Sequence, residues 1–261
     1  MTDLDLSCAG LLPPIAPLEA MPAIRDDLSD AWLTRADARA ASLELAEKIA
    51  SGRKQLVFLF CGANKETVIG LLGAAAAGHA TALIDPSLPE DRLKGLIEAY
   101  RPEIVLGARE FGATMRAVAS GKPHSLESQA GAIEWVSSEA APFPPIDPAL
   151  TVLLSTSGTT GSRKYVRLSR DAVAVNARQI AEAVAVDERS VGIAHLPLHY
   201  SYGLSVVTSH LTAGGRICLI GDSITSPSFW PRIAKAGGTH FPGVPFHYAA
   251  LARLGLSLAP D

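Results

Sequence analysis

The sequence is poor in cysteine, in aromatic residues and in long apolar runs. Its cysteines, Cys8, Cys61 and Cys218, are odd in number and far apart, so they predict neither a disulfide framework nor a metal site. No apolar run approaches the ~18 residues that a membrane-spanning helix needs. The acidic start MTDLDLSCAG also lacks the features of a signal peptide. We therefore expect a cytoplasmic protein in a reducing setting, with no membrane span.

Charge is scarce as well. Charged residues make up 19% of the 261 positions, and the formal net charge is −3. No basic surplus indicates nucleic-acid binding, which depends on a clustered positive surface. Hydrophobic residues make up 48% of the chain, which predicts a globular protein with a sizeable core and excludes general disorder.

Short apolar segments alternate with segments of helical spacing along most of the chain. The apolar segments read QLVFLF, TALI, EIVLG, LTVLLS, SVGIAHL and RICLI. Asn64 and Ser169 are candidate N-caps of two helices between them, and Gly78 is a candidate helix stop. This alternation predicts an α/β fold of mostly parallel sheets, covered by helices on both faces.

The pattern divides the chain into three ranges. Residues 1–28 are rich in proline and leucine without a clear period, which predicts an irregular N-terminal arm. Residues 29–147 form a first α/β subdomain, with a less regular stretch from 107 onward. Residues 148–261 form a second α/β subdomain, which contains a loop rich in glycine, serine and threonine.

That loop begins the segment STSGTTGSRKYVRL, residues 155–168. Gly158 and Gly161 allow positive φ and close backbone approach, so successive amides can form a nest for an anion. Lys164 adds a positive charge close to the second glycine. Hydroxyl donors lie between and before the glycines, at Thr156, Ser157, Thr159 and Thr160. The combination suits nucleotide phosphates.

Two other kinds of loop, a solvated linker and a Walker loop, fit this sequence less well. A solvated linker has a similar composition, but this loop follows a buried strand directly and ends in a basic pair. A Walker loop needs four residues between its glycines and a Gly-Lys-Ser/Thr ending. Here only two residues separate Gly158 from Gly161, and Tyr165 follows Lys164, so the sequence does not fit that pattern.

STSGTTGSRKYV resembles the phosphate-binding signature of the AMP-forming adenylating enzymes, the acyl-CoA synthetase and AMP-dependent ligase superfamily. Arg163 and Tyr165 replace the usual proline and glycine. The resemblance implies that Thr156 to Gly161 wrap the β- and γ-phosphates of ATP. It implies that Lys164 holds the loop or the phosphates, and that Thr160 lies near Mg²⁺.

A second stretch, HLPLHYSYGLSVVTSHLTAGGRICL, resembles the next motif of the family, with Tyr200 at the usual position of an aromatic or histidine gate. The resemblance implies a carboxylate substrate site made by His199, Tyr200, Tyr202 and Gly203. The alternative is that these side chains only pack a loop against the start of a helix. Further similarity extends over residues 30–255, including THFPGVPFHYAAL, which resembles the family's acyl-pocket segment.

Later family motifs are missing from the sequence, among them Tyr-Gly-any-Thr-Glu, a ribose-binding Asp and the domain with the catalytic lysine. We therefore assign no catalytic residue. The resemblance implies the N-terminal part of an acid–CoA ligase-like enzyme that uses ATP and Mg²⁺ to form an acyl-adenylate, with little activity alone. Coenzyme A or a carrier thiol is the candidate acceptor, a carboxylic acid the substrate, and a complementary C-terminal polypeptide a candidate partner.

Rival functions remain open at this point. The chain could be half of a split ligase, a truncated chain, or a degenerate relative that serves as a non-catalytic nucleotide-binding or assembly module. An unrelated kinase or NTPase is disfavoured by the spacing of the loop.

Overall fold

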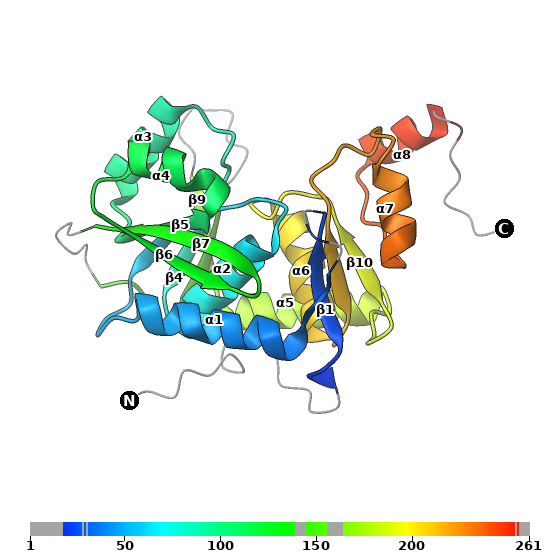
Figure 1. The fold of residues 1–261 in the computed structure, drawn as a ribbon, viewed down its shortest axis with the longest axis horizontal. Helices are drawn as coiled ribbons and strands as arrows, with labels where there is room; N and C mark the ends of the chain where they lie inside the picture. Colours follow the sequence, from blue (N-terminus) through cyan, green and yellow to red (C-terminus); the bar gives the residue numbers. More distant parts are fainter. Residues whose placement is uncertain are drawn as a thin grey trace.

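The computed structural model describes residues 18–27, 29, 31–138, 145–155, 164–253 and 255. Two β-sheets lie side by side in it, with helices packed on their faces (Figure 1). The predicted α/β class is confirmed. Among the described residues, none of the helices combines the length and the hydrophobicity needed to cross a bilayer.

The larger sheet has the strand order β6-β7-β5-β3-β4-β8-β9. Its four central strands are parallel, whereas β7, β6 and β9 run antiparallel to their neighbours. The strand bounds are β3 Leu56–Phe60, β4 Ala80–Ile84, β5 Ile104–Ala108, β6 Lys122–Ser128, β7 Gly131–Ser137, β8 Leu150–Ser155 and β9 Tyr165–Ser169. The central strands are almost wholly buried, as expected of a parallel sheet with both faces covered.

The smaller sheet has the order β10-β11-β1-β2. β10, β11 and β1 are parallel, and β2 pairs antiparallel with β1. The bounds are β1 Pro22–Asp26, β2 Leu33–Thr34, β10 Val191–Ala194 and β11 Arg216–Leu219. A single bridge between Gly192 and His240 extends this sheet beyond β10.

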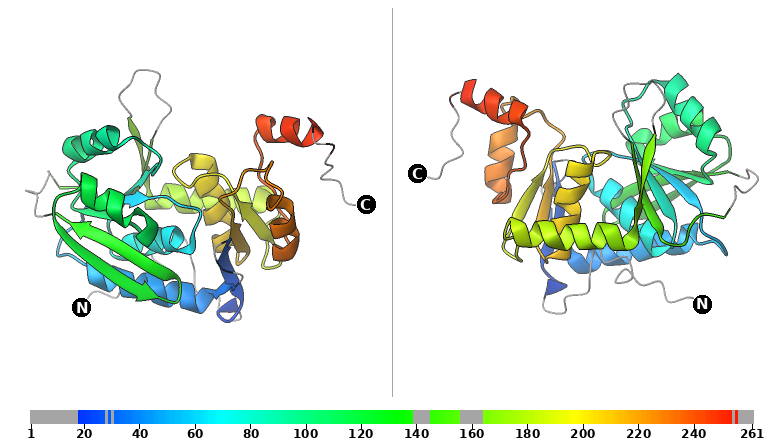
Figure 2. Two further views of the ribbon diagram at one scale, coloured as in Figure 1. Left: turned by 45° about the horizontal axis from the view of Figure 1, so that its top comes forward. Right: turned by 180° about the vertical axis from the view of Figure 1, so that it is seen from behind.

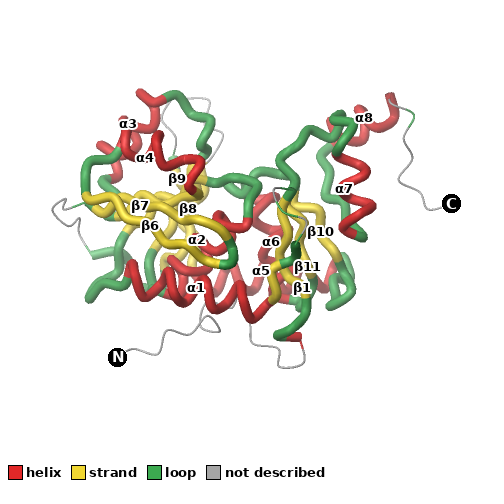
Figure 3. Tube along the Cα trace, in the orientation of Figure 1, coloured by secondary structure: helices red, strands yellow, loops and turns green. Residues whose placement is uncertain are grey.

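Helices cover both faces of each sheet (Figures 2 and 3). In the larger sheet, α2 packs on one face with α1 behind it, and α3 and α4 pack on the other. In the smaller sheet, α6 covers one face beside α5, and α7 covers the other. The bounds are α1 Arg35–Ile49, α2 Lys65–Ala76, α3 Glu90–Tyr100, η3 Arg109–Phe111, α4 Gly112–Val118, α5 Arg170–Ala183, α6 Ser201–Thr212, α7 Phe229–Ala236 and α8 Pro245–Arg253.

A buried arginine connects helices of the two layers. Arg35, the first residue of α1, is 1% exposed. Its guanidinium donates hydrogen bonds to the carbonyl oxygens of Leu211 at 3.1 Å and Gly215 at 3.5 Å, at the end of α6 and just beyond. The positive charge therefore meets carbonyl groups at a helix C-terminus, where the helix dipole favours cations. Burial lowers the pKa of Arg35 from its usual value.

The local sequence signals account for several helix ends. The Asn64 side chain accepts a hydrogen bond from the Thr67 amide at 2.9 Å, which confirms the predicted N-cap of α2. The Ser169 hydroxyl accepts one from the Ala172 amide at 3.1 Å and caps α5 in the same way. Gly78, with φ of 76°, follows the end of α2 as expected.

The predicted irregular arm needs one correction. Its residues 22–26 form strand β1, at the interior of the smaller sheet. The sequence PAIRD hides this strand because two of its buried positions are charged. Arg25 is 6% exposed, and Asp26 is 1% exposed with an ion pair to Lys65 at 3.7 Å.

Sheet membership also departs from the predicted ranges. Strands β8 and β9, at the start of the range 148–261, pair within the larger sheet beside β4. The stretch from 107 that we expected to be less regular contains the hairpin of β6 and β7. The hairpin lies at the edge of the sheet and β6 is largely exposed, so its sequence KPHSLES lacks a run of apolar residues.

Candidate functional site

The two borders of the glycine-rich loop meet at one edge of the larger sheet. Ser155 ends β8, and Lys164 directly precedes β9. Because β8 and β9 are antiparallel neighbours with Ser155 opposite Tyr165, the chain leaves and re-enters the sheet at the same level. This level is the carboxyl end of the parallel strands, where α/β proteins bind their ligands.

The predicted phosphate-binding residues themselves are not described. Thr156, Ser157, Gly158, Thr159, Thr160 and Gly161 lie outside the described residues, and so does Arg163. Their phosphate and metal roles stay predictions. Lys164 is described and exposed at the loop border.

Tyr165 has a packing role that explains its departure from the family signature. Its ring meets the Tyr100 ring edge-on, with 5.2 Å between centroids. It joins the apolar cluster under α3, together with Leu150 and Leu153. Tyr165 therefore anchors the start of β9, where the family's usual glycine could not pack.

The second motif lies at the start of α6. His199 is 5% exposed, and its ring lies 4.4 Å from that of Tyr200. Tyr200 and Tyr202 are 50% and 43% exposed. Of the four predicted substrate residues, only Tyr200 lines the cavity described next. His199 and Gly203 are buried, and Tyr202 is exposed without lining that cavity.

Gly203 is required by close packing rather than by contact with a cavity. A Cβ at this position would lie 2.2 Å from the carbonyl oxygen of Pro197 and 2.6 Å from that of Leu196. Any larger residue would push the first turn of α6 away from the preceding loop.

A cavity of about 860 Å³ connects the loop border to the second motif. One wall comes from β8 and β9, and the other from α5 and the first two turns of α6. Its lining includes Leu154, Ser155, Val166, Tyr200, Ser201 and Leu204. None of the described lining residues is charged, so the described walls suit the neutral groups of a ligand.

Sequence reasoning missed most of this lining. Asn176 of α5 and Ser205 and Thr208 of α6 face the cavity. The spacing Ser201–Ser205 and Leu204–Thr208 is the available signal, because residues four apart share a helix face. This spacing does not indicate which face of the helix lines a cavity.

Asp85, in the turn after β4, is not among the predicted site residues. The structure places its Oδ2 atom 3.8 Å from His199 Nε2, across the boundary between the two sheets. Nearby, burial raises the pKa of the Cys61 thiol, so this cysteine stays protonated and is a poor nucleophile.

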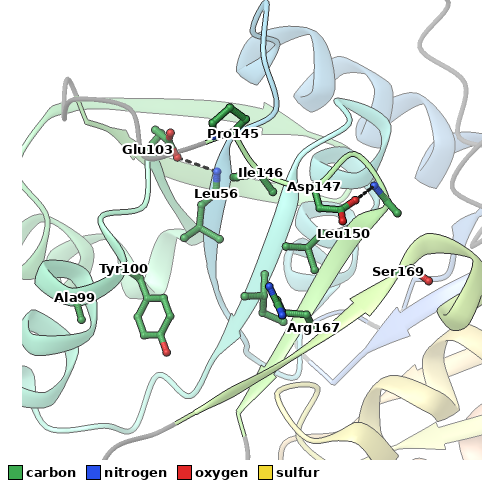
Figure 4. Close-up of a pocket in the computed structure, with 12 residues that line it drawn as sticks. Leu56, Ala99, Tyr100, Glu103, Pro145, Ile146, Asp147, Leu150, Arg167 and Ser169 are labelled. Carbon is green, nitrogen blue, oxygen red and sulfur yellow. Dashed lines mark hydrogen bonds between the residues drawn. The ribbon is translucent and has the colours of Figure 1, made fainter.

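A second cavity, of about 660 Å³, lies on the other face of β8 and β9 (Figure 4). Tyr100, Leu150 and Arg167 line it, near the amino ends of β3 and β8. Its Glu103 carboxylate is already engaged, by the Leu56 amide at 2.8 Å and by Arg53 at 2.7 Å. Because it lies away from the carboxyl ends of the strands, we assign the candidate nucleotide chemistry to the other cavity.

The chain is similar in sequence to parts of nonribosomal peptide synthetases. Nonribosomal peptide synthetase anaPS from Neosartorya fischeri is 27% identical over 218 residues, which is 82% of this chain and 9% of the synthetase. Tyrocidine synthase 3 from Brevibacillus parabrevis is 27% identical over 207 residues, 77% of this chain and 3% of that protein. The chain therefore spans only a small part of these relatives.

Solved structures share the fold. Apo MatB from Rhodopseudomonas palustris superposes with a TM-score of 0.73 at 19% identity, covering 96% of this chain and 51% of MatB. A malonyl-CoA ligase solved with methylmalonyl-CoA and AMP gives a TM-score of 0.72 at 24% identity, covering 95% of this chain and 51% of the ligase. At these identities the match concerns the fold, and this chain corresponds to about half of each enzyme.

The family model described as AMP-binding enzyme matches residues 19–260, nearly the whole chain. The predicted resemblance is confirmed: the chain belongs to the AMP-binding enzyme family and corresponds to an N-terminal region of its members.

Proposed function

We propose that this chain supplies the phosphate-binding part of an ATP-dependent, AMP-forming ligase that activates a carboxylic acid as its acyl-adenylate. The single observation that carries the proposal is the shared cavity. It brings Ser155, at the border of the loop, and Tyr200, at the start of the second motif, into one space at the carboxyl ends of the strands.

The chemistry requires two anions to approach. A carboxylate oxygen of the acid attacks the α-phosphorus of ATP, and pyrophosphate leaves. Hydrogen-bond donors and positive charges must therefore hold both groups in line and stabilise the charge of the transition state. Lys164 supplies a cation at the loop border, and Tyr200, a half-exposed residue that lines the cavity, supplies a hydroxyl for the acid.

Mg²⁺ fits this proposal as an ion held mainly by phosphate oxygens and water. Mg²⁺ usually takes only one or two protein ligands in nucleotide sites. The described residues contain no group of three His, Cys, Asp or Glu side chains that could hold a metal. Thr160 is the proposed protein contributor, and bound Mg²⁺ would neutralise the phosphates.

The complete reaction needs further protein. The sequence contains no Tyr-Gly-any-Thr-Glu segment. We infer that a complementary C-terminal polypeptide supplies this segment. Coenzyme A or a carrier thiol is the proposed acceptor, and the cytoplasm the proposed location.

Direct ATP binding tests the phosphate assignment. The purified chain should bind Mg·ATP weakly, and Lys164→Ala should weaken binding on the order of 10- to 100-fold, since a hydrogen bond to a charged group contributes roughly 1.5–3 kcal/mol. Lys122→Ala, on the exposed edge strand β6, is the matched control and should leave the affinity unchanged. Equilibrium dialysis with labelled ATP measures all three.

Equal ATP affinity in wild type and Lys164→Ala would contradict the assignment. Hydrolysis of ATP by the chain without any acid would instead support a kinase- or NTPase-like activity. The chain could also fail to bind ATP both alone and together with a complementary polypeptide. That result would support a non-catalytic assembly module.

A further inference from the structure

One polar contact connects the two sheets next to Tyr200, which lines the candidate cavity. Asp85 follows β4 of the larger sheet, and His199 precedes α6 of the smaller one. The Oδ2 atom of Asp85 lies 3.8 Å from Nε2 of His199, and the side chains are 14% and 6% exposed. At such burial this contact is shielded from water and salt more than a surface pair.

The two oxygens of Asp85 have different partners. Oδ1 accepts hydrogen bonds from the Ser87 amide at 3.0 Å and the Ser87 hydroxyl at 2.6 Å, which shapes the turn after β4. Oδ2 is the oxygen that faces His199. The turn and the contact between the sheets can therefore be separated by mutation.

The position of Asp85 connects it to the loop. The parallel register pairs Thr81 with Val152 and Ala82 with Leu153, so the end of β4 is level with Ser155 at the end of β8. A carboxylate at this level would repel phosphates at the loop border unless a hydrogen-bond donor or positive charge faces it.

His199 also contacts Tyr200, the residue at the predicted gate position. It directly precedes Tyr200, and the two rings lie 4.4 Å apart with an interplanar angle of 51°. Tyr200 itself is 50% exposed, and its amide donates to the Pro197 carbonyl at 3.0 Å. This hydrogen bond holds the backbone of Tyr200. The described aromatic neighbour of its ring is His199.

We propose that Asp85 and His199 form a positioning pair that orients the Tyr200 ring and holds the second motif against the base of the phosphate loop. The pair acts through Tyr200, so neither member is assigned a catalytic role. The significance of Tyr200 as a gate rests on the proposed function, whereas the positioning itself does not.

The test uses the 261-residue chain labelled with 3-fluorotyrosine, with the Tyr200 ¹⁹F resonance assigned by Tyr200→Phe. Asp85→Asn keeps an oxygen for the turn but removes the charge that faces His199, and His199→Gln breaks the pair from the other side. Each should shift and broaden the Tyr200 resonance. The double variant should shift it no further than the larger single effect, because the two residues act as a unit.

Two controls separate positioning from local damage. Ser87→Ala removes the hydroxyl that donates to Oδ1 of Asp85 but leaves Oδ2, which faces His199, and Asp91→Asn removes an exposed carboxylate from the first turn of α3. Both should leave the Tyr200 resonance in place. Circular dichroism verifies that each variant is folded, and His199→Gln remains informative if Asp85→Asn is not.

An unchanged Tyr200 resonance in both single variants, or additive shifts in the double variant, would overturn the proposal. The same samples receive Mg·ATP in a second step. If ATP does not bind although the resonance shifts as expected, the proposed function fails while the positioning pair stands.

Discussion

Two histidines, the buried His210 and the partly buried His195, have pKa values well below that of a solvated imidazole. Burial lowers the pKa of His210 to about 4 and that of His195 to about 4, from an unperturbed 6.5. His210 Nδ1 lies 2.8 Å from the Val206 carbonyl oxygen and donates to it, and a Cβ on Gly192 would lie 2.6 Å from its Nε2. The folded chain therefore keeps both rings neutral near pH 6.

This burial predicts a pH dependence of stability. Above about pH 6.5 both states hold neutral rings, and the shift has no effect. As the pH falls from about 6.5 to 4, these histidines bind protons in the unfolded chain but not in the folded chain. The free energy of unfolding therefore decreases. His210→Gln should lose part of this slope in urea titrations between pH 7 and 5, whereas His195 and His79, whose pKa values burial also lowers, should keep contributing to it.

Ser205→Ala, on the same helix α6 as His210, removes no titratable group and is the control that should keep the wild-type slope. An identical slope in wild type and His210→Gln would show that the His210 ring is solvated in the folded chain, and would contradict the packing described.

At the scale of elements, the start of α6 depends on one glycine. Gly203→Ala would place a methyl group 2.2 Å from the Pro197 carbonyl oxygen, so backbone must move. We expect a loss of roughly 2–4 kcal/mol in the free energy of unfolding, since strain of this kind belongs to the large mutational effects. Chemical denaturation measures the loss.

Gly95→Ala is the informative counterpart. Gly95 lies inside α3 with nothing within 4 Å of an added Cβ, so alanine should stabilise the chain by roughly 0.5–1 kcal/mol. A Gly203→Ala variant as stable as wild type would mean that α6 begins farther from the preceding loop than the structure indicates.

Local chemistry made many elements predictable. Asn64 and Ser169 cap their helices as the sequence indicates, and the apolar runs become the central strands. Strand β6 of the hairpin escaped prediction because it is largely exposed, and strand β1 because two of its buried residues are charged. Their stability comes from neighbours in the sheet, which single-segment periodicity does not report.

At the scale of the whole molecule, the site depends on contacts between distant residues. Arg35 joins α1 to the end of α6, and Asp85 meets His199, over separations of more than a hundred positions. The motifs predicted that residues 155–164 and 199–203 would act together. The spacing alone did not predict the cavity between them or the Asp85 contact, because both arise from the packing of two sheets.

Acid-dependent ATP–pyrophosphate exchange measures whether the loop holds ATP for attack by a carboxylic acid. The chain is co-expressed with the reading frame that supplies the missing motifs, and a panel of carboxylic acids is screened. We predict exchange that requires both polypeptides and an acid, and that falls at least about tenfold in Lys164→Ala, the loss of a charged hydrogen bond. Exchange that is unchanged in Lys164→Ala would contradict the account.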